Sequence, residues 1–305
     1  MPNRLVAIVG VGKIAQDQHV PAIDASPDWE LAATVSRAGS VEGIPTFRDF
    51  DVMLLERPDI EVVSLCLPPQ PRFQYARKAL KAGRHVMLEK PPGQTLAEVH
   101  ELQQLAQEAG VTLFATWHSR MGKGVTGAKA ALAGQEVTRG TITWKEDVRQ
   151  WHPGQDWVFE PGGMGVFDPG INALSILTEI LPKPVHVIRA ELDYPENRQT
   201  PIAARVEFTR GVEMELDWLQ QGPPSWDMSI ETAEGTRVTL RFGGNELEVN
   251  GEKRPVSEVE EYPALYARMA ELVNRGESDV DLSPMVHVAD AMTLGKRNVV
   301  EAFAF

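Results

Sequence analysis

The sequence contains a single cysteine, Cys66, so no disulfide can form within the chain. It lies in the apolar segment VVSLCLPP, where cysteine is more often a small buried side chain than a nucleophile. No apolar run approaches the roughly 20 residues of a membrane-spanning helix, and the first apolar segment breaks into glycines too soon for a signal peptide. Positive charge is also scarce: 30 lysines and arginines against 43 acidic residues give a net charge of -13. This balance argues against nucleic acid or an anionic membrane as a partner, and we expect a cytoplasmic protein.

The chain has 305 residues, enough for two domains, and its apolar pattern changes near residue 120. Before that point, short apolar runs such as LVAIVG and HVMLE alternate with amphipathic stretches, which is typical of a parallel sheet covered on both faces. We therefore predict a doubly wound Rossmann domain over residues 1–120. Later segments such as VEMELDWL alternate apolar and polar residues, as strands with one covered face do. We predict that residues 121–305 form an α+β domain with an open, mostly antiparallel sheet, whose last helix could pack back on the first domain.

The hexapeptide GVGKIA, from Gly10 to Ala15, follows the first predicted strand and opens the first predicted helix. Dinucleotide-binding loops occur in this context. Gly10 would permit the tight turn, and Gly12 would let the backbone approach a pyrophosphate at the free N–H groups of the helix. An ordinary strand-to-helix turn is the alternative for so short a motif. The order of strand, loop, helix and second strand favours the nucleotide site.

The end of the second predicted strand should decide between NAD and NADP. A site that prefers NAD places an acidic residue there to bind the ribose 2′-hydroxyl. This chain instead has Ser36 and Arg37 in the segment VSRAGS, and its next acidic residue is Glu42. A hydroxyl and a guanidinium suit a 2′-phosphate, so we predict NADP, with NAD as the second choice. The alternative is that Arg37 only faces solvent at a strand end.

Three segments, GVGKIA, EKPPG and GGMGVFDPGIN, occur in this order and together resemble the Gfo/Idh/MocA oxidoreductases. Longer segments such as GKIAQDQHVPAI, WKEDVRQWHPGQ and ENRQTPIAA closely resemble the members of that family that act as 1-dehydrogenases on D-galactose and L-arabinose. The resemblance runs along almost the whole chain. It implies oxidation of the anomeric hydroxyl of an aldopyranose to a lactone, with hydride transfer to a nicotinamide. It also implies further nucleotide contacts, at Lys13, Ile14, Pro68, Glu89 and Lys90.

Lys90 follows the fifth predicted strand directly, in the segment EKPPG. Open α/β sheets bind ligands at the carboxyl ends of their strands, so we expect Lys90 near the nicotinamide. Its ammonium could hold the sugar O1 and stabilise the negative charge that develops there as the proton leaves. A surface lysine is the alternative. The two prolines that follow suggest a cis Lys90-Pro91 peptide.

The segment DPGINA predicts a helix that carries Asp168 and Asn172 on one face. An aspartate before proline can also be a helix cap whose carboxylate serves only the backbone. The resemblance implies an active-site role, because the matching acid lies at the active site of related enzymes. Many relatives have a histidine, their usual acid–base residue, where this chain has Asn172. An amide cannot accept the proton, so we assign the general base to Asp168, alone or shared with Lys90, and substrate hydrogen bonding to Asn172.

The other pocket residues are predicted mainly from the segment WKEDVRQWHP. Glu146 and His152 could hydrogen-bond sugar hydroxyls, and Trp151 could present an apolar face to the C–H groups of the ring. His118 follows the sixth predicted strand, and Trp226 resembles a tryptophan that closes the sugar site. Each could instead be a satisfied interior side chain. The seven histidines lack short ligand spacing and no second cysteine exists, so we predict no metal site.

The main alternative function is a non-catalytic regulator that senses a dinucleotide and a sugar with the same fold. A lysine and an acid at the hydride end favour the enzyme. D-Galactose and L-arabinose differ only in the hydroxymethyl group on C5, so a pocket separates them through one small contact, and both remain candidate substrates. The exposed face of an open sheet predicts a homodimer.

Overall fold

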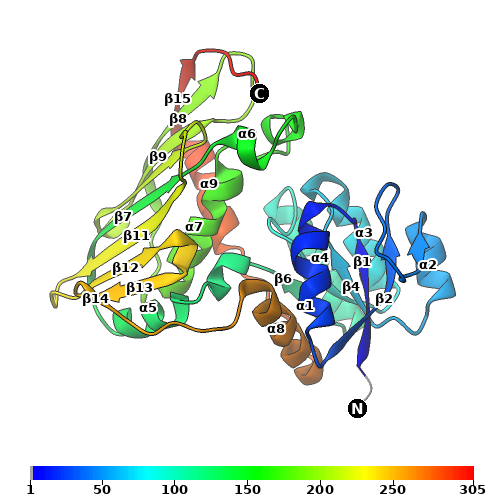
Figure 1. Ribbon diagram of the computed structural model, residues 1–305. Coiled ribbons are helices and arrows are strands. Elements are labelled where there is room, and N and C mark those ends of the chain that lie inside the picture. The colour runs from blue at the N-terminus through cyan, green and yellow to red at the C-terminus, as the bar shows by residue number, and fades with distance from the viewer. Residues whose placement is uncertain (1–2) are drawn as a thin grey trace. The chain divides into compact units, whose positions relative to one another are not determined.

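The computed structural model describes residues 3–305, which divide into two compact units (Figure 1). The first unit combines Met1–His118 with Val259–Asp281, and the second combines Ser119–Glu258 with Leu282–Phe305. The chain first passes from one unit to the other between His118 and Ser119, close to the predicted boundary at residue 120. The second predicted domain is not continuous, however, because residues 259–281 belong to the first unit. No described helix is both long and apolar enough to cross a membrane.

A six-stranded parallel sheet forms the centre of the first unit, with the strand order β3-β2-β1-β4-β5-β6. The strands are β1 (Arg4–Val9), β2 (Trp29–Val35), β3 (Thr46–Phe47), β4 (Val62–Leu65), β5 (His85–Leu88) and β6 (Leu113–Ala115). The chain moves outward from β1 to β3 and then returns to β4 on the other side of β1. Ligands of such sheets bind beyond the carboxyl ends of the strands at this reversal.

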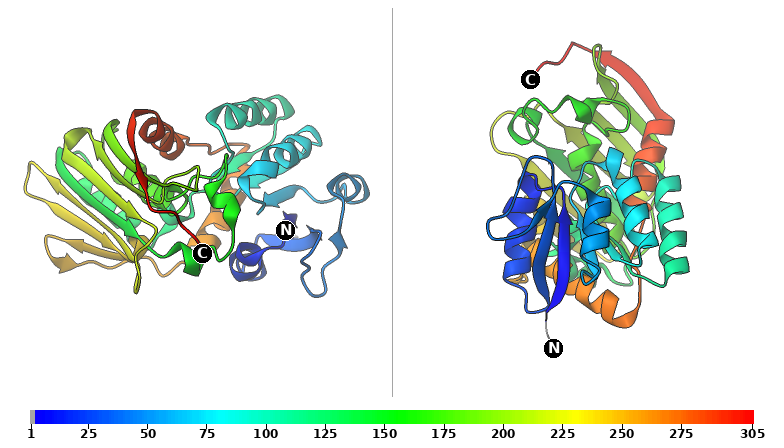
Figure 2. Two further views of the ribbon diagram at one scale, coloured as in Figure 1. Left: turned by 90° about the horizontal axis from the view of Figure 1, so that it is seen from above. Right: turned by 90° about the vertical axis from the view of Figure 1, so that its right-hand side faces the viewer.

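Helices cover both faces of this sheet (Figure 2). They are the π-helical segment Ala15–His19 with α1 (Val20–Asp24), then α2 (Phe50–Glu56), α3 (Pro69–Lys81) and α4 (Leu96–Ala109). In the right-hand view of Figure 2, α1 in dark blue and the pair α3 and α4 in lighter blue and cyan lie on opposite sides of the strands. The prediction of a doubly wound Rossmann domain is confirmed.

Helix α8 (Glu261–Arg275) joins the first unit from late in the sequence and packs against α1. Its buried face includes Tyr266, whose carbonyl accepts a hydrogen bond from Trp29 Nε1 at 2.9 Å. The chain after α8 continues the sheet beside β6, because Asp279 N donates to Leu113 O at 3.0 Å and Asp279 O accepts from Ala115 N at 2.9 Å.

The second unit contains a nine-stranded sheet with the order β14-β13-β12-β11-β7-β10-β9-β8-β15. The strands are β7 (Val137–Lys145), β8 (Val187–Pro195), β9 (Ala203–Phe208), β10 (Val212–Asp217), β11 (Ser225–Thr232), β12 (Arg237–Arg241), β13 (Glu246–Val249), β14 (Glu252–Lys253) and β15 (Gly295–Val300). Two neighbouring pairs, β7 with β10 and β8 with β15, are parallel, and the others are antiparallel. The predicted α+β domain with a mostly antiparallel sheet is confirmed.

Three helices cover one face of this sheet, α5 (Val125–Leu132), α7 (Phe167–Ile180) and α9 (Ser283–Leu294) (Figure 1). Strand β10 illustrates the difference between the two faces of the sheet. Its side chains Val212, Met214 and Leu216 are buried on the covered face, whereas Glu213 is exposed on the other. The last helix, α9, belongs to the second unit and packs on α7 and β8. The helix that joins the Rossmann unit is α8.

Candidate active site

The loop after β1 has the geometry that a dinucleotide requires. Gly10 has φ +92°, and a Cβ there would lie 3.1 Å from Leu67 N and 3.2 Å from the carbonyl carbon of Cys66. Only glycine allows the ends of β1 and β4 to approach so closely. A Cβ on Gly12 would meet no atom within 4 Å, so the space beside that backbone is open. The loop therefore fits a nicotinamide dinucleotide whose pyrophosphate approaches Gly12.

The other predicted nucleotide residues near this loop lie at the carboxyl ends of β1 and β4. The helical stretch begins at residue 13, and Gln16 N donates to Gly12 O at 3.1 Å. Lys13 is exposed and pairs with Asp17, and Ile14 is 39% exposed. Pro68, also exposed, precedes α3 directly.

The two predicted ribose residues follow β2. Ser36 N donates to Phe47 O at 2.9 Å, and Ser36 Oγ accepts from Gly39 N at 3.0 Å, so the serine shapes its own loop. Arg37 is exposed, and within residues 3–305 its guanidinium makes no ion pair. A cation without a protein counter-ion is available to an anionic ligand.

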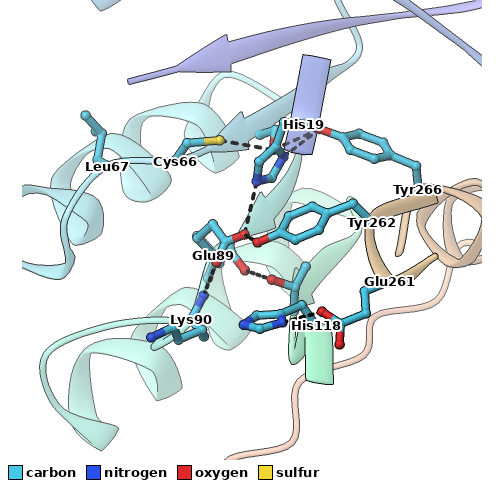
Figure 3. A network of polar contacts seen from close by, with 12 residues as sticks. His19, Cys66, Leu67, Glu89, Lys90, His118, Glu261, Tyr262 and Tyr266 are labelled. Carbon is cyan, nitrogen blue, oxygen red and sulfur yellow. Dashed lines mark hydrogen bonds and ion pairs between the residues drawn. The ribbon is translucent and has the colours of Figure 1, made fainter. Parts of the chain in front are cut away.

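Glu89, at the end of β5, is buried and hydrogen-bonded to protein groups (Figure 3). Its Oε1 contacts His19 Nε2 at 3.0 Å and accepts from the Tyr262 hydroxyl at 2.7 Å, and its Oε2 accepts from Lys90 N at 2.9 Å. His19 Nδ1 lies 2.9 Å from the Tyr266 hydroxyl. The carboxylate therefore holds the backbone of Lys90 from the interior of the unit.

Two opposed shifts of pKa accompany this burial. Burial raises the pKa of the Glu89 carboxyl, but the hydrogen bond and charge of His19, with smaller effects of His118 and Tyr262, together lower it more, and the net pKa lies well below its ordinary value. Burial lowers the pKa of His19, but Cys66, Tyr266 and Glu89 raise it more, and the net pKa lies well above its ordinary value. The two side chains therefore form a buried ion pair at neutral pH.

The peptide between Lys90 and Pro91 is cis, as predicted. The buried Arg72 side chain, on α3, donates to the carbonyl oxygens of Leu67, Glu89 and Pro91. One guanidinium thus joins the segments that follow β4 and β5. The sequence analysis missed Arg72, because an arginine on an amphipathic helix gives no sign of being buried.

His118 follows β6 and is oriented by α8. Its Nδ1 lies 2.7 Å from Glu261 Oε2, and its ring stacks on Tyr262 with centroids 5.8 Å apart and planes 19° apart. Through Tyr262, this predicted substrate residue is connected to Glu89 and Lys90 (Figure 3). Neither residue of α8 was predicted, since nothing local to the sequence indicates which unit the helix joins.

In the second unit, Glu146 follows β7 and accepts hydrogen bonds from two indoles. Trp226 Nε1 lies 2.9 Å from Oε2, and Trp218 Nε1 lies 3.3 Å from Oε1. The Trp226 ring also stacks on Trp144, at 6.1 Å, and contacts Trp151, at 5.6 Å. Glu146 is buried, whereas Trp151 is 44% exposed and offers an open aromatic face. Trp218 was not predicted, although it ends the alternating segment VEMELDWL.

Asp168 and His152 form a second polar pair in this unit, with Asp168 Oδ2 3.2 Å from His152 Nε2. Asp168 lies in the first turn of α7, whose N-cap is Val166. The carboxylate is thus not at the capping position that the alternative interpretation required. Asn172 is partly buried one turn further along α7. The His152 ring makes an edge contact with Trp218, with centroids 5.5 Å apart, so Asp168 and His152 are connected through Trp218 to Glu146 and Trp226.

This combination of side chains can bind and deprotonate a polyhydroxylated ligand. Carboxylates and a histidine supply acceptors for hydroxyl groups, and indole faces supply apolar surface for C–H groups. Among residues 3–305 there is no group of three histidine, cysteine or acidic side chains that could hold a metal ion.

Comparison with known proteins gives three kinds of match. The family model GFO_IDH_MocA, described as "Oxidoreductase family, NAD-binding Rossmann fold", matches residues 4–116. The chain is 40% identical over 310 residues to galactose 1-dehydrogenase from Pseudomonas fluorescens, with 99% of each chain covered. It is 52% identical to a D-galactose-1-dehydrogenase of known structure from Rhizobium etli, with a TM-score of 0.94 and coverage of 100% of this chain and 99% of that one.

A more distant structure shows similarity of fold alone. KijD10, a 3-ketoreductase from Actinomadura kijaniata solved in complex with NADP, is 16% identical with a TM-score of 0.79, over 98% of this chain and 100% of its own.

Proposed function

Since the chain belongs to the Gfo/Idh/MocA family of oxidoreductases, we propose that it is an aldose 1-dehydrogenase that oxidises the anomeric hydroxyl of D-galactose to the lactone. The observation that carries this proposal is the group of Glu146, His152 and Asp168 among tryptophan rings in the second unit. A pyranose needs such a mixture of hydroxyl partners and aromatic faces. The 40% identity to a galactose 1-dehydrogenase along the whole chain supports the choice of sugar.

In this proposal, Asp168 accepts the proton of the anomeric hydroxyl and Lys90 stabilises the charge that develops on the same oxygen. A bound nicotinamide nucleotide would accept the hydride from C1. His118, Glu146 and Asn172 bind sugar hydroxyls. Glu89 contributes from the interior, because its carboxylate holds the backbone of Lys90. The regulator alternative is not favoured, since the relatives that support the sugar are named as enzymes.

We propose NADP as the nucleotide, because Arg37 is exposed at the end of β2 and no acidic residue follows it directly. L-Arabinose is proposed as a second substrate, because it lacks only the hydroxymethyl group of D-galactose. Losing the contact with one such small group would cost about 1–3 kcal/mol of transition-state binding.

The test is nucleotide reduction with a panel of aldoses, using NADP and NAD in turn and a coupled assay for the lactone. We expect reduction with D-galactose and L-arabinose, little with the C4 epimer D-glucose, and higher kcat/KM with NADP. Tight binding of NADP without reduction by any aldose would reject the enzyme and favour the regulator. Activity on an unrelated polyol would keep the enzyme and reject the sugar.

A further inference from the structure

The His152 ring lies between two oxygen acceptors in the second unit. Its Nε2 is 3.2 Å from Asp168 Oδ2, and its Nδ1 is 3.2 Å from Gln155 Oε1. A tight turn brings Gln155 back to the ring, since Gln155 N donates to His152 O at 3.1 Å and Gly154 has φ +67°. Both ring nitrogens therefore face polar side chains of the same unit.

Trp157 fixes which end of the Gln155 amide faces the ring. An indole N–H can only donate, and Trp157 Nε1 lies 3.1 Å from Gln155 Oε1. The atom shared by the two contacts is therefore the amide oxygen. It follows that His152 Nδ1 carries a hydrogen, because an oxygen acceptor cannot bond a nitrogen lone pair. In the neutral imidazole, Nε2 then has no hydrogen.

A neutral His152 would consequently direct a lone pair at the Asp168 carboxylate. Two acceptors 3.2 Å apart form a hydrogen bond only when one proton is added, to Nε2 or to Oδ2. The ring packs in edge contacts against Trp218, with centroids 5.5 Å apart, and Trp157, with centroids 6.1 Å apart, and these contacts favour one orientation of the ring. The Asp168 side chain is 10% exposed and that of His152 21%, so water relieves this contact only in part.

We propose that His152 and Asp168 act as one proton acceptor, and that Gln155 is the positioning residue that keeps it ready to accept. This inference rests on the proposed function. In the oxidation, the C1–H bond breaks and its electron pair leaves as hydride to the nicotinamide dinucleotide. The O1–H bond breaks, its proton goes to the pair, and C1 and O1 form the carbonyl of the lactone. The proton ends between Nε2 and Oδ2, where it converts a contact of two acceptors into a charge-assisted hydrogen bond.

Gln155→Leu tests this role, because it removes the acceptor for Nδ1 and leaves the ring in contact with Asp168. The neutral ring should then carry its proton on Nε2 and already be bonded to Asp168. We expect kcat with D-galactose to fall about 10²-fold, at the lower end of the effect of a positioned base, with less than a threefold change in KM. Gln155→Glu still accepts from Nδ1 and should keep kcat within about threefold. Gln150→Leu, on the exposed side of α6 (Val148–Trp151), is the matched control and should change neither constant.

The histidine tautomer supplies a readout that does not depend on turnover. In ¹⁵N-histidine NMR spectra of the whole chain, with His152 assigned by a His152→Gln variant, the neutral ring should be protonated at Nδ1 in wild type. It should be protonated at Nε2 in Gln155→Leu. If Gln155→Leu does not fold, Trp157→Phe takes its place. This variant removes only the N–H donor that orients the Gln155 amide, and it should shift the tautomer of His152 in the same direction.

Four outcomes separate the possibilities. A switched tautomer with a large loss of kcat supports the proposal, whereas near-wild-type kcat in Gln155→Leu overturns it. A wild-type ring protonated at Nε2 also overturns it, whatever the kinetics. If the wild-type protein oxidises no aldose, the proposed function and the proton acceptor fail together, and the spectra still show whether Gln155 sets the tautomer.

Discussion

At the scale of single residues, two acidic side chains at the ends of elements have contrasting surroundings. Glu89 is enclosed by donors of its own unit, and its carboxylate acts on the chain itself. Asp168 lies in the first turn of α7 beside His152, whose other ring nitrogen contacts Gln155. The first arrangement favours a permanently charged group, and the second is the pair that we propose as the proton acceptor.

Asp168→Asn should lower the turnover number by about 10² to 10⁴, because an amide cannot accept the proton of the anomeric hydroxyl. The size of the side chain is kept, so the melting temperature should change little. Steady-state kinetics and thermal unfolding measure both quantities. Glu213→Gln, which removes an exposed carboxylate from β10, is the control. Near-wild-type turnover of a folded Asp168→Asn would mean that the carboxylate is not the base.

Removing one partner of the buried pair should destabilise the protein strongly. We expect Glu89→Gln and His19→Gln each to lower the free energy of unfolding by about 3–5 kcal/mol, because each leaves a buried charge without its counter-ion. The double variant should lose clearly less than the sum of the two. Chemical denaturation of the four proteins gives the coupling energy, and simple additivity would show that the two side chains do not interact.

The same pair should make stability depend on pH in two directions. The lowered pKa of Glu89 means that its contribution is present above about 4.5 and is lost as the pH falls through the folded value. The raised pKa of His19 means that its contribution is full below about 6.5 and is lost as the pH rises through the folded value. We therefore expect the difference in unfolding free energy between wild type and the double variant to be largest between about pH 4.5 and 6.5. Chemical denaturation of both proteins at a series of pH values measures this difference.

Arg37→Ala should raise KM for NADP at least about tenfold while leaving KM for NAD nearly unchanged, because only NADP carries the 2′-phosphate. Lys81→Ala removes an exposed cation from the end of α3 and should alter neither constant. Equal effects of Arg37→Ala on the two nucleotides would reject the assignment.

At the scale of elements, the pattern of apolar residues predicted the strands and helices, but not which unit each helix joins. Short apolar runs such as HVML form buried parallel strands where helices flank them, so the doubly wound parallel sheet of the first unit could be predicted from the sequence. Helix α8 could not be assigned in this way. Its buried face, with Tyr262 and Tyr266, needs a partner surface, but the helical period does not say which of two sheets supplies it.

Some residues of the candidate site could likewise be predicted from local sequence, and others could not. His152 and Glu146 stand out because the segment around them is dense in aromatic and polar residues. Gln155 ends the same segment and Trp218 lies near the end of VEMELDWL, but neither residue was predicted, because their importance arises from what their polar atoms face after folding. The buried role of Arg72 depends on three carbonyl oxygens from two separate segments, one after β4 and one after β5, which no single stretch of sequence contains.

The glycines after β1 offer a matched pair of substitutions. Gly10→Ala should destabilise the first unit, because its Cβ would collide with the segment after β4 and its φ is positive. Gly12→Ala meets open space and should leave the melting temperature within about 2 °C, since surface changes alter stability little. It should nonetheless weaken nucleotide binding at least about tenfold, because the methyl occupies the space expected for the pyrophosphate. Calorimetric titration with NADP measures this, and unchanged affinity would place the nucleotide elsewhere.

At the scale of the whole molecule, the face of the nine-stranded sheet that α5, α7 and α9 leave uncovered is polar. Lys145 and Glu215 form an ion pair on it at 2.8 Å, and neighbouring positions on β7 and β10 carry threonine and glutamate. A homodimer that used this face would therefore depend on charge pairs and ordered water more than on apolar burial.

We expect light scattering on a sizing column to give twice the chain mass of 33.7 kDa at low salt. The apparent mass should fall towards that of one chain as salt screens the polar face. A dimer that resists high salt would point to an apolar interface, and a single-chain mass at low salt would reject the homodimer.

The return of the chain through α8 has a consequence for biosynthesis. A ribosome makes the protein from its amino terminus, so β1 to β6 emerge long before residues 259–281. Until then the Trp29 indole lacks the Tyr266 carbonyl, and the His19 and Glu89 pair lacks both tyrosine hydroxyls. The nucleotide-binding half therefore cannot complete its fold during translation. It waits until the chain from β7 to β14 and then α8 have been made.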